Sequence, residues 1–252
     1  MIMNAIKSLI VSVLGLACLH ANGQGLVTDR PDQTESSSTV PKESLQIESG
    51  MLFGFSGVGM LSIRHFAGPS TLFRLGLFEG FEIRLTNQYE HIKFRGSSTG
   101  IGGISDMEIG AKIELLGNEN SKTKIAFLSH VILPTGTSGL SPEQYGTINK
   151  LALSYDVNET VGLGFNVGYD NYGVGNGDLT YAAVIGYGLT EKLGIFVESY
   201  GQVVEFEDLI SNFDCGFTYL IKDNFQVDFS LGTGMNNQMN FISSGLSWNV
   251  GM

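Results

Sequence analysis

The segment from Asn212 to Thr233 most restricts the fold of this chain. Large apolar residues alternate with small or polar residues on both sides of a turn-like stretch, Ile221 to Asn224. Because successive side chains of a strand point to opposite faces, this period of two predicts a hairpin with one apolar and one polar face. The apolar face would carry Phe213, Cys215, Phe217, Tyr219, Phe225, Val227, Phe229 and Leu231. The rest of the fold must give this face an apolar neighbour, either lipid or protein.

The same alternation recurs from Ser44 onward and predicts an all-β protein of about 12 antiparallel strands. No segment here has a helical period, and none approaches the roughly 18 apolar residues of a helical membrane span. The predicted strands are Leu45–Phe55, Gly59–Leu77, Phe81–Glu90, Met107–Leu115, Lys124–Leu133, Tyr145–Tyr155, Thr160–Asp170, Asp178–Gly188, Leu193–Val204, the two strands of the hairpin, and Asn240–Val250.

The connections between these strands alternate between short and long. The short ones are Leu77–Gly80, Gly117–Ser121, Asp156–Glu159, Leu189–Lys192 and Ile221–Asp223. The long ones are Arg95–Gly103, Pro134–Gln144, Asn171–Gly177, Glu205–Ile210 and Gly234–Met239. Outer-membrane barrels have short periplasmic turns and longer extracellular loops. We therefore predict an antiparallel transmembrane β-barrel over residues 44–252 with both termini periplasmic. A secreted β-sandwich is the alternative, but it has no reason to keep this order.

Residues 1–23 have the pattern of a secretory signal peptide. Lys7 precedes an apolar run that ends at Leu19, and small residues precede the predicted cleavage after Gly23. Cys18 raises the alternative of a lipoprotein signal, although a glycine stands where such signals have a larger aliphatic residue. The pattern predicts export and, with the barrel, localisation in the outer membrane of a Gram-negative bacterium.

The charge and the scattered reactive residues argue against several functions. The net charge of −11 disfavours nucleic acid and anionic membrane surfaces as partners. His65, His91 and His130 lack metal-ligand spacing, and we find no catalytic constellation, so we expect neither an enzyme nor a metal or cofactor. The run Gly100–Gly103 lacks the helix of a phosphate-binding loop, and we expect an extracellular loop that adopts positive φ.

Two sets of polar residues are candidates for the barrel interior. Residues 24–43 have no periodicity, and we expect either a mobile extension or a segment placed in the lumen; its plug candidates are Asp29, Arg30, Asp32 and Glu35. On the strands, charges of both signs share the polar faces, where opposite charges can compensate for burial. The lumen-lining candidates are Glu82, Arg84, Glu90, Glu108, Lys112, Glu114, Lys124, His130, Glu198, Asp214 and Asp228.

Several motifs resemble one family of outer-membrane proteins. The run Thr28 to Asp32 followed by Thr34-Glu35-Ser36, and later FLSHVILPTG, is similar to proteins grouped as meta-pathway phenol-degradation transporters. The resemblance spans the mature chain and implies a β-barrel that takes up aromatic compounds. One departure concerns the C-terminus, because these barrels commonly end on an aromatic residue that the insertion machinery reads, whereas this chain ends with Met252.

The strands and the resemblance together predict a passive channel for small, aromatic or apolar molecules. Its expected partners are outer-membrane lipid, the barrel-insertion machinery and the solute. A barrel of about 12 strands is narrower than the porins that leave an aqueous channel, so lumen charges and residues 24–43 could nearly close it. The alternative is a non-transport barrel whose loops 95–103 and 134–144 bind a ligand or a surface.

Overall fold

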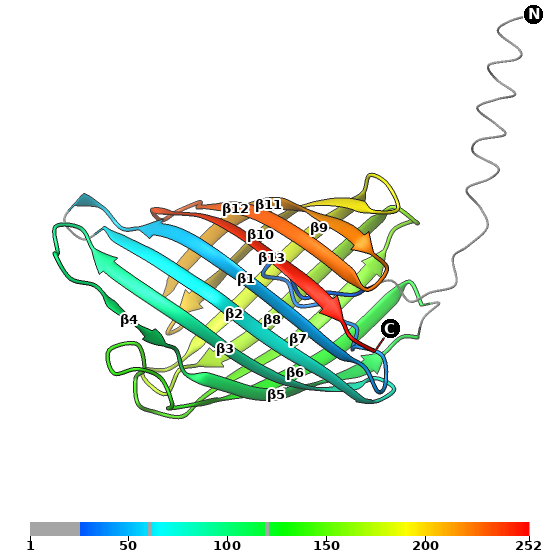
Figure 1. Cartoon of the computed structure of the whole chain (residues 1–252), viewed down its shortest axis with the longest axis horizontal. Helices are drawn as coiled ribbons and strands as arrows, with labels where there is room; N and C mark the ends of the chain where they lie inside the picture. Colours follow the sequence, from blue (N-terminus) through cyan, green and yellow to red (C-terminus); the bar gives the residue numbers. More distant parts are fainter. Residues whose placement is uncertain (1–25, 60–61, 119–120, 252) are drawn as a thin grey trace, which may run out of the picture.

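The computed structural model describes residues 26–59, 62–118 and 121–251, so the predicted signal peptide lies outside the described residues. The described chain forms strands without helices (Figure 1). The strands are β1 (Leu45–Ser56), β2 (Ile63–Phe78), β3 (Phe81–Phe94), β4 (Ile101–Ile104), β5 (Met107–Leu116), β6 (Thr123–Leu133), β7 (Gly146–Asp156), β8 (Val161–Asn171), β9 (Asp178–Gly188), β10 (Leu193–Val204), β11 (Asp208–Lys222), β12 (Phe225–Gly234) and β13 (Met239–Asn249). Among these residues no helix is long and apolar enough to cross a membrane.

The strands close into a single antiparallel barrel. Apart from β4, each strand pairs with the next strand along the chain, with β3 pairing to β5, and the pairing of β1 with β13 closes the ring. The short strand β4 does not add a strand position to the ring, because β4 and β5 pair with successive parts of the same edge of β3. Thr86 of β3 faces Glu108 of β5, and Tyr89 faces Ile104 of β4. The barrel therefore has twelve strand positions, which confirms the predicted number and excludes the β-sandwich.

One predicted loop is wrong in part. Ile101 to Ile104 forms β4 instead of an irregular connection, and Gly100, Gly102 and Gly103 are not among the residues with positive φ. The physical reason is the length of β3, which extends past the end of β5 and presents unpaired main-chain groups. Residues 101–104 satisfy them by pairing with residues 89–92.

The two ends of the barrel differ in their connections. Both described ends of the chain lie at one end, here called the turn end, and the opposite end is called the loop end (Figure 1). At the loop end, residues 134–145 form the longest connection. The predicted long loop Glu205–Ile210 is wrong, because β10 ends at Val204 and β11 begins at Asp208. The alternation of β11 continues through Leu209 and Ile210, so only residues 205–207 make the turn.

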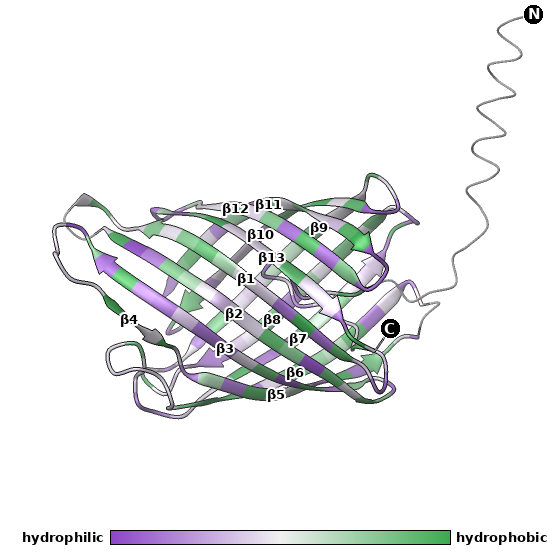
Figure 2. Ribbon diagram, viewed as in Figure 1, coloured by the Kyte–Doolittle hydropathy of each residue, from purple (hydrophilic) through white to green (hydrophobic). Residues whose placement is uncertain are grey.

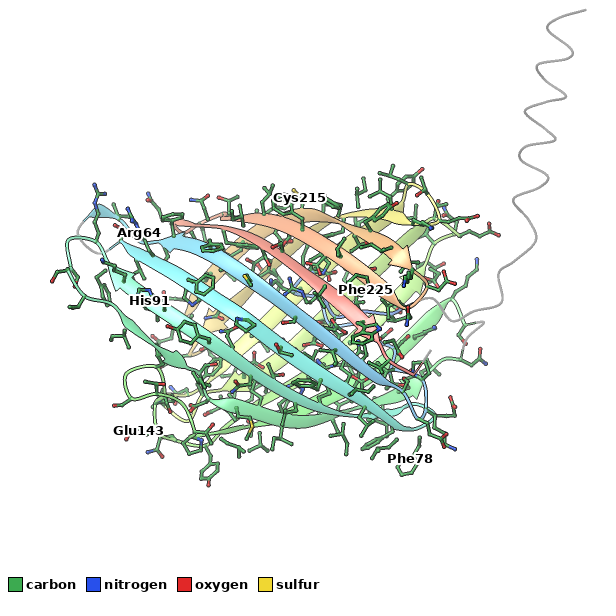
Figure 3. The ribbon with its side chains drawn as sticks, in the orientation of Figure 1. Arg64, Phe78, His91, Glu143, Cys215 and Phe225 are labelled. Carbon is green, nitrogen blue, oxygen red and sulfur yellow. The ribbon has the colours of Figure 1, made fainter. Side chains whose placement is uncertain are left out.

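The barrel is apolar outside and polar inside, the reverse of a water-soluble domain. Figure 2 shows apolar and polar residues alternating along the strands, and Figure 3 shows side chains such as Phe78 and Cys215 on the outer surface. On the β11–β12 hairpin, Phe217 is 41% exposed and stacks on Phe229, whereas Asp214 is fully buried. The largest fully buried side chains include Arg74, Arg84, Lys112, Gln46, Glu48, Glu82 and Glu198.

Substituting neighbouring positions of β11 tests which face meets lipid. We expect Phe217→Arg to destabilise the barrel by about 2–4 kcal/mol, the cost of a cation on the lipid face near the bilayer midplane. Thr218→Arg should cost much less, because Thr218 lines an internal cavity. Urea unfolding of the protein folded into lipid vesicles measures both changes. Equal effects of the two substitutions would contradict the assignment of faces.

Candidate functional site in the barrel interior

The irregular segment 26–43 lies inside the barrel (Figure 1), and the wall binds its main chain. Five residues of the segment donate their main-chain N–H groups to inward side chains of β1, β10, β8, β5 and β3. The donors Asp29, Gln33, Glu35, Thr39 and Val40 reach Glu48, Glu198, Asn166, Glu114 and Glu82, with N···O distances of 3.0, 2.7, 2.6, 2.7 and 2.7 Å. Because a segment without secondary structure cannot pair its own main chain, these side chains take over that role.

A central ion cluster joins the segment to one side of the wall. We define it as the cations Arg74, Arg84 and Lys112 with the carboxylates Asp29, Glu35, Glu48 and Glu82. The Arg74 guanidinium donates to Glu82 at 2.9 Å and to Glu48 at 2.8 Å. It also donates to the main-chain oxygens of Val27 and Ser38. Arg84 and Glu82, both predicted to line the lumen, form an ion pair at 2.9 Å.

Asp29 occupies the centre of this cluster. Its carboxylate accepts from Arg84 at 2.6 Å and from Lys112 at 3.0 Å, and it lies 3.3 Å from Arg74. Burial raises the pKa of the Asp29 carboxyl, but the three cations outweigh that effect and hold the pKa well below its usual range. The ionised side chain also accepts from the main-chain N–H of Ser36 at 2.8 Å and thereby folds the segment back on itself.

Two residues of this cluster, Glu48 and Arg74, are not among the candidates predicted from the sequence, although they form an ion pair at 2.8 Å. For Arg74 the cause is an irregularity of its strand. Where the paired strand β1 has one residue, Met51, β2 has two, Gly68 and Pro69. This bulge shifts the register of β2 between Ala67 and Ser70. A strand with one extra residue reverses which side chains point inward. A single period therefore cannot be followed through residues 59–77, and the side chain of Arg74 could not be assigned a face from alternation.

Arg30 fills a notch in the adjoining part of the wall, formed by β1, β13 and β12. Its guanidinium donates to Asp228 at 2.9 Å and to Ser243 at 3.3 Å. Gly50 and Gly245 face each other on β1 and β13, and a Cβ at either position would overlap the guanidinium. Glycine is needed at both positions because only a side chain reduced to hydrogen lets the segment approach the strands this closely.

Three carboxyl groups gather where the segment turns. Glu198 on β10 faces Asp214 on β11 and accepts from the N–H of Gln33 and the hydroxyl of Thr34. Neither oxygen of Asp214 has a hydrogen-bond partner in the described part of the chain. Burial, and then the neighbouring carboxylates Glu198 and Asp214, raise the pKa of Asp32 well above its usual range. We call Asp32, Glu198 and Asp214 the carboxylate group.

The other predicted interior residues lie apart from the segment. Glu108 pairs with His130 at 2.9 Å, and His130 in turn accepts from Arg84 at 3.0 Å. Glu90 lies 3.3 Å from His65. Lys124 shares the inward alternation of Ala126 and His130 but forms none of the ion pairs of the described residues. That these residues line a conducting path stays a prediction.

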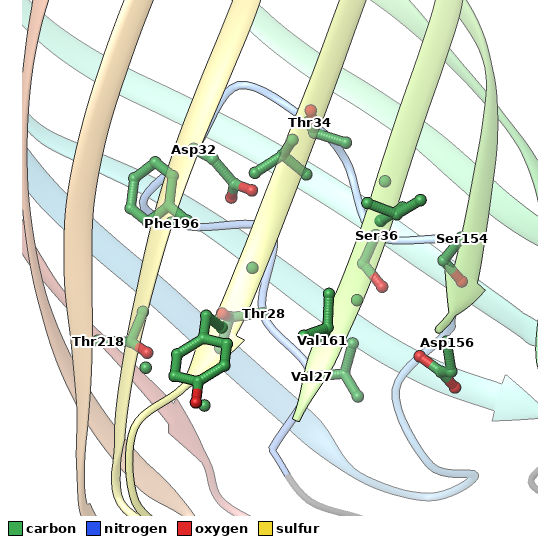
Figure 4. Close-up of a pocket in the computed structure, with 18 of the residues that line it drawn as sticks. Val27, Thr28, Asp32, Thr34, Ser36, Ser154, Asp156, Val161, Phe196 and Thr218 are labelled. Carbon is green, nitrogen blue, oxygen red and sulfur yellow. The ribbon is translucent and has the colours of Figure 1, made fainter. Parts of the chain in front are cut away.

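Two cavities lie on opposite sides of the segment, along the wall from β7 to β11. The turn-end cavity measures about 480 Å³, and Figure 4 shows Val27, Thr28, Asp32, Thr34 and Ser36 of the segment on one side of it. Its far side is formed by wall residues that include Ser154, Asp156, Val161, Phe196 and Thr218. The loop-end cavity measures about 440 Å³ and has Gln33 of the segment in its lining. Residues 32–34 therefore separate the two cavities.

The comparisons with known proteins agree with this architecture. The model of the family described as "Putative MetA-pathway of phenol degradation" matches residues 28–249. The chain belongs to this family. The match begins at Thr28, so the family sequence includes the segment that occupies the interior as well as the twelve barrel positions. Among curated proteins, no sequence matches the chain significantly.

Solved structures share the fold of this family member at low sequence identity. An outer membrane channel from Pseudomonas putida F1 superposes with a TM-score of 0.68 at 10% identity, over 88% of this chain and 100% of that chain. The KdgM porin in complex with disordered oligogalacturonate has a TM-score of 0.53 at 12% identity, over 81% and 98%. The translocator domain of the autotransporter NalP from Neisseria meningitidis has a TM-score of 0.50 at 12% identity, over 81% and 88%. These likenesses establish an outer-membrane type of barrel.

Proposed function

We propose that this protein is a passive outer-membrane channel whose bore is narrowed by residues 26–43. The carrying observation is the pair of cavities that meet residues 32–34 from opposite ends of the barrel. The fold shared with a channel and a porin supports the proposal. The signal peptide 1–23 would be removed on export, lipid would surround the outer face, and both termini would be periplasmic. The proposal includes no catalytic step.

The solute would follow the β7–β11 side of the lumen. On the opposite side the central ion cluster fills the space between the wall and the segment with paired charges, and its members Arg74, Lys112 and Glu82 are fully buried. Along the β7–β11 side, residues 32–34 are held mainly by Glu198, which accepts from Gln33 and Thr34. The resistance of the channel would therefore lie at this contact.

The charges along this path favour cations over anions. Arg30, Arg74, Arg84 and Lys112 are all in ion pairs, whereas the three members of the carboxylate group form none of the ion pairs of the described residues. A fixed negative potential attracts cations into a narrow low-dielectric passage. At a pH high enough to ionise the carboxylate group, reversal potentials in a potassium chloride gradient should show cation selectivity, and Asp214→Asn should reduce it several-fold.

Conductance of the mature chain in planar bilayers tests the proposal. Folded protein should give discrete current steps, and proteoliposomes should swell in small neutral solutes. Folded protein that gives neither current nor swelling would overturn the channel. In that case the loops become the candidate, and shortening residues 134–145 should abolish binding to a surface or ligand without changing the barrel.

Conductance should also rise with pH because of Asp32. We call the segment docked when it lies in the lumen as described above, and undocked when it has left the lumen. Docking raises the pKa of Asp32, so protonated Asp32 stabilises the docked segment. This stabilisation is complete below the pKa of the undocked side chain, about 3.9. That contribution is lost as the pH rises through the docked pKa, when the ionised side chain repels Glu198 and Asp214. We expect a several-fold rise in conductance across this titration, and Asp32→Asn should abolish it. A conductance that falls with pH in both proteins would contradict the assignment.

A further inference from the structure

The loop-end cavity is lined by hydrogen-bonding groups that the protein itself leaves unused. The hydroxyls of Tyr172 and Tyr200 and the side-chain amide of Gln202 form no hydrogen bond within the described residues, and neither does Lys150. Asp170 is 4% exposed, and one of its carboxylate oxygens likewise has no partner there. The Thr180 hydroxyl in the same lining is also buried without a partner among the described residues. Buried polar groups are normally hydrogen-bonded, so Asp170 and Thr180 are suited to a ligand that supplies the missing partners, and the more exposed polar groups of Tyr172, Tyr200, Gln202 and Lys150 border the same space.

The kind of groups present defines the ligand. Amides offer both donors and acceptors, phenols do the same, and the cavity adds one ammonium and one carboxylate. A hydroxyl is the ligand group that can serve as donor to some of these and acceptor from others. The rings of Tyr172 and Tyr200 add apolar faces that fit the C–H side of a saturated ring.

The charges favour a neutral ligand. Lys150 and Asp170 are the cavity's charged residues and have opposite signs. Beyond the lining, Asp214 and Glu198 lie near Tyr200, and Glu108 and Asp178 lie near Tyr172. This surplus of carboxylates disfavours an anion, and the lining itself attracts no ion strongly because Lys150 and Asp170 offset each other's charge. The volume of about 440 Å³ falls within the range of roughly 300–1,000 Å³ found for small-molecule sites.

We propose that the loop-end cavity binds a neutral, polyhydroxylated ring compound of the size of a mono- or disaccharide. This inference rests on the proposed channel function, for which it names the class of solute. The lining contrasts with the aromatic solutes that the family description suggests, since a phenol could satisfy only a small part of these polar groups. The ligand would enter from the loop end and lie above Gln33, the residue next to the narrowest contact.

Calorimetric titration of the folded mature chain with galactose, galacturonate and phenol tests the inference. Galactose and galacturonate differ in a single group, which carries the negative charge, so they form a matched pair. We expect galactose to bind at least about tenfold more tightly than galacturonate or phenol. Tyr200→Phe and Gln202→Leu should each weaken galactose binding by about tenfold, the effect of one lost hydrogen bond. Tyr219→Phe is the control, because Tyr219 lies on the outer surface and is 44% exposed.

Proteoliposome swelling separates this inference from the channel. Swelling in galactose without calorimetric binding would keep the channel and overturn the binding site. Binding of galactose without swelling or current would keep the binding site and overturn the channel. Tighter binding of phenol or galacturonate than of galactose would overturn the proposed class of ligand, and so would an equal loss of binding in Tyr219→Phe.

Discussion

Deleting residues 26–40 should raise the single-channel conductance several-fold. The deletion removes the turn 32–34 that separates the two cavities and leaves a continuous lumen along the β7–β11 wall. A twelve-stranded barrel is narrower than a general porin, so the open state should still conduct less than porins of about 16–18 strands. Planar-bilayer recording measures the change, and heat-modifiable migration on gels shows whether the variant is folded.

A disulfide tether provides the opposite manipulation in the full chain. A Cβ built at Gly164 would lie 3.1 Å from Cγ2 of Thr34, so Thr34→Cys with Gly164→Cys brings two cysteines close enough for a disulfide. The side chain of Val184 must shift in this variant, because its Cγ1 would lie 2.7 Å from the new Cβ. The pair should be made with Cys215→Ser, because Cys215 is a free cysteine. Oxidation should lower the conductance and reduction should restore it. Unchanged conductance in both the deletion and the tether would show that the segment does not limit flow.

Replacing Arg74 by methionine should destabilise the folded barrel by about 3–5 kcal/mol. That is the usual cost of removing one partner from a buried ionic cluster, because the remaining charges stay buried without compensation. Here the substitution leaves Glu48 without a cation and removes two hydrogen bonds that hold the main chain of the segment, to Val27 and Ser38. Urea unfolding in lipid vesicles measures the loss.

Arg64→Met is the matched control on the same strand. Arg64 is exposed at the loop end (Figure 3) and takes part in none of the ion pairs of the described residues, so its replacement should change stability by less than about 0.5 kcal/mol. Arg74→Lys should recover only part of the loss, because an ammonium cannot reproduce the planar fork that reaches Glu48 and Glu82 together. Equal stability of Arg74→Met and Arg64→Met would show that the cluster contributes nothing net.

Much of the barrel followed from alternation alone. The period of two placed Phe217 outside and Asp214 inside, and it gave twelve strand positions, because one lipid-facing and one polar face are a local property of each strand. The sequence pattern was weaker at places where local structure breaks that period. The bulge at Gly68 and Pro69 prevented the inward direction of Arg74 from being predicted by alternation. Residues Ile101–Ile104 form a strand because they pair with the part of β3 that β5 leaves unpaired.

The sequence by itself determined which side chains are charged, which faces they share and that residues 26–43 lack regular structure. Only the tertiary structure decided which of these charges meet. Asp29 is separated from Lys112 by 83 positions and from Arg84 by 55, yet it bonds both, because closing the ring brings β3 and β5 against the same stretch of the segment. Likewise, the Arg30 side chain fits against the wall because Gly50 and Gly245 lie side by side and have no Cβ. These two glycines become neighbours only when β1 pairs with β13 and closes the ring. Partners of this kind depend on ring closure and carry no local signature.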